Sequence, residues 1–167
     1  MAFENDILVG FQPKFKSIDR DCDRYSDILF EYHENGDFDA KTFLDLNAAG
    51  SLWITFEYID RALFDKVEQY LRSAIINRDT HGVLHPQVLT IFERLLNHSQ
   101  EDRVIGIYSD AIKHRLAYVT STSTPPKRRA FYLPPLKQMI TDFETLLGRL
   151  QADQSIAKDF QKVLSNT

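Results

Sequence analysis

The sequence predicts an all-α fold, an irregular bundle of five or six main helices with a short irregular N-terminal arm. Apolar residues recur at steps of three and four along most of the chain, the spacing that gives a helix one apolar face. Gly and Pro number only six each in 167 residues, too few for the many turns of an all-β fold. Apolar residues make up 43% and charged residues 26%, so we expect a single helical domain over residues 1–167.

The first part of the chain predicts an arm and two helices. Residues 1–16 contain a short apolar run that Pro13 soon breaks, so they are expected to form the irregular arm. An apolar stripe predicts a helix over about residues 17–34, which Asn35 and Gly36 end with residue types that tolerate positive φ. A shorter helix is expected over 39–46.

The longest predicted helix covers residues 51–77. Its apolar stripe is wider than one packing face requires, which is typical of a central helix that touches several neighbours or another subunit. We therefore expect this helix to be the central element of the fold. Its main stripe consists of Leu52, Phe56, Ile59, Leu63, Val67, Tyr70 and Ala74.

Four further segments follow. Pro86 predicts the start of one helix, and Ser99 to Asp102 resembles a capping box that would start the next. Two Pro-Pro pairs interrupt residues 120–135, so this segment is expected to be a long loop that is either mobile or functional. Pro135 then starts a C-terminal helix, and Ser155 caps a last short one. The expected buried positions are Val88, Leu89, Phe92, Leu95 and Leu96, then Val104, Tyr108, Ala111, Ile112 and Val119, then Leu136, Met139 or Ile140, Phe143, Leu146 or Leu147, and Leu150, and finally Ile156, Phe160, Val163 and Leu164.

Charge and cysteine content exclude several classes of protein. The formal net charge is −4 and the isoelectric point about 5.7, whereas proteins that bind nucleic acid are usually basic. Cys22 is the single cysteine, so no intramolecular disulfide can form, and its place on an apolar stripe predicts a buried, inert thiol. The acidic N-terminus is unlike a secretory leader, and no apolar run is long enough for a membrane span. These features predict a cytoplasmic protein without a membrane-spanning segment.

The acidic and histidine-containing turns give weak signals for metal binding. A calcium loop needs glycine at its sixth position and glutamate at its twelfth. The turns at Gly36 and Gly82 have the glycine, but Thr42 and Val88 stand where the carboxylate is required. We therefore expect no metal and no cofactor, and keep a degenerate calcium-hand protein as an alternative. We also expect no metal at the acidic cluster Asp19, Asp21, Asp23 and Asp27. The pair His81 and His85 is not expected to bind zinc, because the sequence shows no third ligand.

One segment mixes cations with aromatic rings. The basic triplet Lys127, Arg128 and Arg129 is followed closely by Phe131 and Tyr132, a combination that suits a phosphate together with a stacked base. The alternative is that the charges face water while the two rings anchor the segment on the core. We favour this alternative because one basic triplet contributes little binding at physiological salt.

The sequence names no catalytic residue. Phosphate-binding glycine loops, the serine-hydrolase elbow and the zinc-protease helix motif are all absent. Some helical RNases place an Arg and a His a few residues apart on one helix, and the nearest fragments here are 113–115 and 78–81, neither with the required spacing. The leading hypothesis is a non-enzymatic helical protein that binds a protein partner or a second copy of itself. The alternative is a small nucleic-acid-binding protein or RNase-like enzyme that uses residues 127–132.

Overall fold

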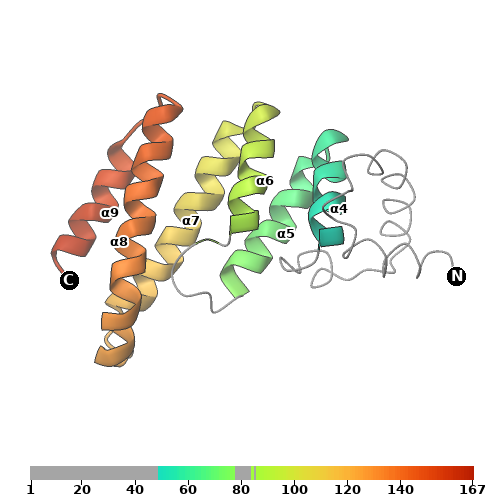
Figure 1. The fold of residues 1–167 in the computed structure, drawn as a ribbon. Helices are drawn as coiled ribbons and strands as arrows, with labels where there is room; N and C mark the ends of the chain where they lie inside the picture. The colour runs from blue at the N-terminus through green and yellow to red at the C-terminus, as the bar shows by residue number, and fades with distance from the viewer. Residues whose placement is uncertain (1–48, 78–83, 85) are drawn as a thin grey trace, which may run out of the picture. The chain divides into compact units, whose positions relative to one another are not determined.

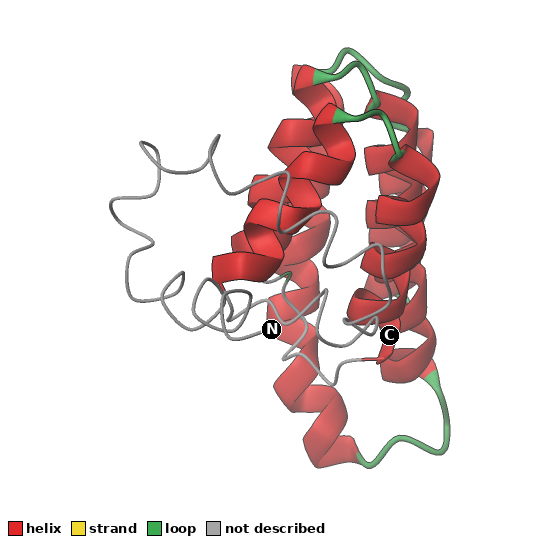
Figure 2. Cartoon of the chain, turned by 90° about the vertical axis from the view of Figure 1, so that its right-hand side faces the viewer, coloured by secondary structure: helices red, strands yellow, loops and turns green. Residues whose placement is uncertain are grey.

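The computed structural model describes residues 49–77, 84 and 86–167, and every regular element among them is an α-helix (Figure 2). The prediction of an all-α fold is therefore confirmed. No described helix is both long and apolar enough to cross a membrane. The predicted arm over 1–16 and the predicted helices over 17–34 and 39–46 lie outside the described residues.

The described helices belong to two compact units. The first contains α4 (Ala49–Asp60), most of α5 (Phe64–Asn77) and α6 (Pro86–Asn97). The second contains α7 (Glu101–Thr120), α8 (Pro126–Arg149) and α9 (Ser155–Ser165) (Figure 1). The expectation of one domain over residues 1–167 stays a prediction.

The prediction of one uninterrupted helix over 51–77 is wrong, because the chain turns between α4 and α5. The Leu63 N–H donates to the Tyr58 carbonyl at 2.9 Å, and the Ala62 N–H donates to the Ile59 carbonyl at 2.9 Å. These two bonds form a Schellman motif, whose left-handed residue is usually glycine. Here Ala62 takes that position with φ of 60°, at a cost of about 1 kcal/mol for a residue with a Cβ. The wide apolar stripe thus consists of two short faces rather than one central helix.

In the first unit, α4 packs against α6. The apolar face of α6 is largely as the sequence predicts, but Leu89 is 43% exposed and Ile91 takes its place in the core. The expectation that Leu89 is buried is therefore wrong. The fully or nearly fully buried apolar residues of this unit are Tyr58, Ile59, Val67, Leu71, Val88, Ile91, Phe92 and Leu95.

In the second unit, α8 packs against both α7 and α9, and α9 also contacts α7 (Figure 1). The predicted stripes of all three helices supply most of the core, but Leu150 and Ile156 are only half-buried. Val163 of α9 is 44% exposed although the pattern places it inward. The buried apolar residues of these three helices are Val104, Ile107, Tyr108, Ala111, Ile112, Leu116, Val119, Leu136, Met139, Ile140, Phe143, Leu147, Ala157, Phe160 and Leu164.

The prediction of a long loop over 120–135 is also wrong. Helix α8 already begins at Pro126, and only residues 121–125 connect it to α7. Pro126 stands at the first helical position, where a missing N–H costs nothing. Pro134 and Pro135 lie inside the helix and leave the carbonyls of Ala130 and Phe131 without their usual donors. Ala130 and Phe131 are both exposed, so water can replace the lost donors.

Two predicted helix caps differ from those observed. The residue before α7 is Gln100, which makes no side-chain cap bond, and Ser99 adopts a left-handed φ of 59°. At α9, Ser155 does not accept the capping bond. Its own N–H donates to Asp153 Oδ1 at 2.9 Å, and its hydroxyl donates to the same oxygen. The Asp153 carboxylate thus accepts the first N–H of α9, whereas the N-cap residue Gln154 makes no side-chain capping bond.

Candidate docking surface

The basic and aromatic residues singled out from the sequence lie on the first two turns of α8 rather than in a loop. Lys127 and Arg128 are exposed there. Phe131 is 59% exposed, the largest exposure among the exposed large apolar residues of the described chain. The helix thus presents two cations and an aromatic ring to solvent within five consecutive residues.

A third aromatic residue, Tyr118 near the end of α7, joins this surface. Its ring lies 5.6 Å from the ring of Tyr132 at an interplanar angle of 84°, and Tyr132 lies 5.2 Å from Phe131 at 88°. Both are edge-to-face arrangements, the favourable geometry for aromatic pairs. We name the set Tyr118, Lys127, Arg128, Phe131 and Tyr132 the aromatic–basic patch.

Sequence reasoning missed Tyr118 because it is separated from Tyr132 by the connection between α7 and α8. Its exposed fraction of 39% places it at the surface although its neighbour Val119 is buried. The available signal is the helical period: Tyr118 falls beside, and not on, the apolar stripe of α7 that ends at Val119.

Arg129 has a different role from its two basic neighbours. It is half-buried, and its Nη2 donates to the carbonyl of Ser121 at 3.0 Å. Its Nε is buried and has no hydrogen-bond partner among the described residues. Arg129 therefore fastens α8 to the connection that precedes it, and the patch does not include it.

Hydrogen bonds order the short connection 121–125 between the two helices that carry the patch. Thr124 is 5% exposed, and its hydroxyl donates to the Tyr118 carbonyl at 2.5 Å. The Ser123 N–H donates to Ser121 Oγ at 3.3 Å. Because Thr124 is tied to the backbone of Tyr118, the connection fixes the end of α7 beside the start of α8. The aromatic rings of the patch are thus supported by two helices and an ordered turn.

The composition of the patch resembles that of known recognition surfaces. Exposed aromatic rings beside Arg or Lys are enriched at the centres of protein interfaces, and they also stack on the bases of single-stranded nucleic acids. Residues 99–167 carry ten Lys and Arg against seven Asp and Glu, so this part of the chain opposes the acidic balance of the whole.

A metal centre does not appear among the described residues, since no three His, Cys, Asp or Glu side chains there could share an ion. The turns at Gly36 and Gly82, the cluster Asp19 to Asp27, Cys22, and the pair His81 and His85 all lie outside the described residues. His114 is exposed on α7. The prediction that no metal binds stays a prediction.

A second polar cluster, in the first unit, combines Asp60 at the end of α4 with Arg94 on the last turn of α6 and His98 just after that helix. Arg94 Nε donates to Asp60 Oδ1 at 3.0 Å and its Nη2 donates to Oδ2, so the pair is bidentate. His98 Nε2 lies 3.0 Å from the same Oδ1. The guanidinium of Arg94 also lies 4.9 Å from the ring centre of Phe56. This Arg and His pair, four residues apart at the end of α6, was not singled out from the sequence.

The geometry of this cluster suits packing rather than catalysis. Both oxygens of Asp60 are bonded to Arg94, and the ring of His98 packs edge-on against Phe64 at 6.0 Å between centres. A catalytic Arg needs its donors directed at a substrate, but here they bind the carboxylate. The cluster fastens the last turn of α4 to the last turn of α6.

The charge network predicts a stability change with pH. Partial burial alone would raise the pKa of Asp60, but the hydrogen bonds and charges of Arg94 and His98 outweigh it and lower the pKa below its ordinary 3.8. A lowered folded-state pKa adds stability above pH 3.8 that is lost as the pH falls through the folded value. Asp60→Asn should therefore destabilise by at most about 1 kcal/mol at neutral pH, because the side chains are over a third exposed and water screens them.

Urea unfolding, followed by the fluorescence of Trp53 in the first unit, measures this effect. The difference between wild type and Asp60→Asn should shrink between about pH 5 and pH 3. An unchanged difference over that range would show that the carboxylate charge does not contribute.

The second unit contains buried polar groups that are structural. The hydroxyl of Tyr108 donates to the Met139 carbonyl of α8 at 3.4 Å, and burial, with a smaller contribution from Asp142, strongly raises the pKa of Tyr108. Arg115 is half-buried, which lowers its pKa, and its Nη1 donates to the Ala111 carbonyl at 3.3 Å. Tyr108 thus stays neutral and links α7 to α8.

Comparisons with models of protein families, with curated proteins and with solved structures each find no match for this chain. The geometry of the aromatic–basic patch is therefore the basis for assigning a function.

Proposed function

We propose that this chain is a non-enzymatic helical interaction protein, and that the aromatic–basic patch binds an acidic, apolar segment of a partner protein. The observation that carries the proposal is the patch itself: three aromatic rings in edge-to-face contact and two exposed cations, presented by two packed helices. Such rings supply contact area at low conformational cost. The cations select the charge of the partner and speed its association.

The charge of the chain favours a protein partner over a nucleic acid. The net charge of −4 would repel a phosphate backbone, and two patch cations release few counterions. A short acidic segment of a protein carries less charge, and its apolar side chains can cover Phe131. Single-stranded nucleic acid is the competing ligand because the same rings could stack on bases.

Fluorescence anisotropy with the full chain at physiological salt tests the proposal. The probes are a labelled peptide that alternates Glu with Phe and Leu, the same peptide with Lys in place of Glu, and an oligothymidylate. We expect saturable binding of the acidic peptide and weaker binding of the other two. Phe131→Ala should weaken binding of the acidic peptide about tenfold, as loss of an aromatic anchor at an interface does. Absence of binding by the acidic peptide, or tighter binding of the oligothymidylate, contradicts the proposal.

Two matched variants make the result specific to the patch. The double variant Lys127→Glu with Arg128→Glu reverses the charge of the patch. Its control is Lys158→Glu with Lys162→Glu, which makes the same charge change at two exposed lysines of α9. The apolar change at Phe131 is repeated by Leu89→Ala, since Leu89 is 43% exposed on α6. Only the patch variants should lose binding. Equal losses in the α9 pair would show attraction by overall charge and would contradict a defined site.

A further inference from the structure

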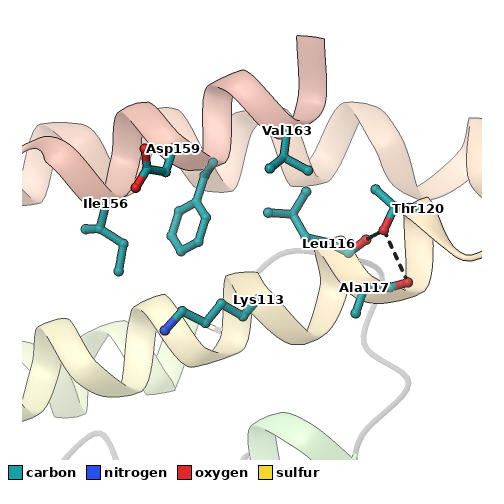
Figure 3. A pocket seen from close by; sticks show the side chains of 8 residues that line it. Lys113, Leu116, Ala117, Thr120, Ile156, Asp159 and Val163 are labelled. Atoms are coloured by element: carbon teal, nitrogen blue, oxygen red, sulfur yellow. Dashed lines mark hydrogen bonds between the residues drawn. The ribbon is translucent and has the colours of Figure 1, made fainter. Parts of the chain in front are cut away.

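A groove runs between α7 and α9 (Figure 3). From α7 it is lined by Lys113, Leu116, Ala117 and Thr120. These positions have the spacing i, i+3, i+4 and i+7, which places them on one face over two helical turns. One wall of the groove is therefore a continuous stripe.

The other wall repeats the pattern on α9, with Ile156, Asp159, Phe160 and Val163 at the same spacing (Figure 3). The cavity between the two stripes measures about 530 Å³ and is open to solvent. A small molecule is usually buried by 70–90% of its surface in its site, which an open groove does not provide. Two parallel stripes of helical spacing instead suit a third helix laid between them.

The floor of the groove is apolar. Leu116 and Phe160 are each 6% exposed, whereas Val163 at the rim is 44% exposed. The hydroxyl of Thr120 donates to the Leu116 carbonyl of its own helix at 2.7 Å, so its hydrogen is already used. The groove therefore offers a ligand apolar contact along its length and little hydrogen bonding.

The groove has two charged side chains of opposite sign, one on each wall. Lys113 stands on α7 and Asp159 on α9, toward the same end of the groove (Figure 3). Lys113 Nζ lies 3.6 Å from Asp110 of its own helix, in a pair whose side chains are 57% and 43% exposed. Such an exposed pair contributes little, so Lys113 can exchange it for a ligand carboxylate.

We propose that this groove binds an amphipathic α-helix of a partner protein, with an acidic residue facing Lys113 and a basic residue facing Asp159. The apolar residues of that helix, spaced as those of α7 and α9, cover Leu116, Phe160 and Val163. The two charges lie at one end of the groove, so they favour a bound helix whose flanks at that end match them, since exchanged flanks there set like charges together. The bound helix makes α7, α8 and α9 part of a four-helix arrangement. This site is independent of the aromatic–basic patch.

Fluorescence anisotropy with the full chain tests the groove with two synthetic helical peptides. Both carry leucine at the spacing i, i+3, i+4 and i+7. One has Glu and Lys flanking this stripe to match Lys113 and Asp159, and the other has the two flanks exchanged. We expect the matched peptide to bind about tenfold more tightly than the exchanged one. The double variant Lys113→Glu with Asp159→Lys should reverse this preference.

Ala117→Trp provides a second test. Ala117 is exposed and lines the groove, so the indole fills the groove without disturbing the core, and circular dichroism checks that the fold is kept. Binding of the matched peptide should be lost, whereas Phe131→Ala should leave it unchanged. Absence of binding to wild type, a preference that the double variant does not reverse, or binding that survives Ala117→Trp would each overturn the proposal.

Discussion

Phe143→Ala is expected to lower the free energy of unfolding of the second unit by about 3–5 kcal/mol, the usual cost of removing a buried phenyl ring. Phe143 is 0% exposed. Its ring lies 4.9 Å from that of Tyr108 on α7 and 6.1 Å from that of Phe160 on α9. Because one side chain contacts both neighbouring helices, its loss opens a cavity where α7, α8 and α9 meet. Neighbouring side chains can fill such a cavity only in part.

Urea unfolding measured by circular dichroism provides the measurement, and Phe131→Ala provides the control. Phe131 stands on the same helix and loses the same atoms, but it is 59% exposed, so its replacement should change the stability by less than about 0.5 kcal/mol. Similar losses for both variants would contradict the assignment of Phe143 to the core. Trp53, the single tryptophan of the chain, lies in the first unit and reports that unit separately.

The importance of Phe143 could be predicted from the sequence because helical period alone places it. The stripe through Leu136, Phe143 and Leu147 repeats at helical spacing, and all three side chains are buried. The same holds for α7, where Val104, Tyr108, Ala111, Ile112 and Val119 are all buried as predicted. Burial follows period wherever one face meets one core.

The ends of the helices were harder to predict than burial, because they depend on the backbone conformation of individual residues. The turn at Ala62 has no glycine to mark it, and tertiary contacts anchor the helix end that precedes it. Among these is the bidentate pair of Asp60 with Arg94, 34 residues apart in the sequence. A pair so distant in the sequence leaves no local signal. The turn therefore divides a stripe that looks continuous in the sequence.

The residues of the candidate surface were largely predicted from the sequence, but their helical conformation was not. Lys127, Arg128, Phe131 and Tyr132 were identified because cations and rings lie next to one another in the sequence. The two Pro-Pro pairs, however, suggested a loop, and the structure shows a helix through the second pair. A helix orders these side chains at fixed angles and brings Tyr118 to Tyr132. The patch is thus more rigid than the sequence implied, which lowers the entropic cost of binding.

Pro134→Ala is expected to stabilise the second unit by about 2 kcal/mol. Proline inside a helix costs about 3 kcal/mol relative to alanine, and restriction of the unfolded chain returns less than about 1 kcal/mol of this. Alanine at position 134 restores a donor for the Ala130 carbonyl. Pro134 is exposed, so its removal disturbs no packed contact. Urea unfolding followed by circular dichroism measures the gain.

Pro126→Ala is the matched control on the same helix. Pro126 stands at the first helical position, where its missing N–H has no helical acceptor and its fixed φ suits the helix. Its replacement should therefore leave the stability unchanged or lower it slightly. A gain at position 134 without one at 126 follows only if α8 continues through both prolines in solution. Were residues 126–135 a loop instead, neither variant would gain a hydrogen bond, and Phe131 and Tyr132 would lose the helical support on which the patch depends.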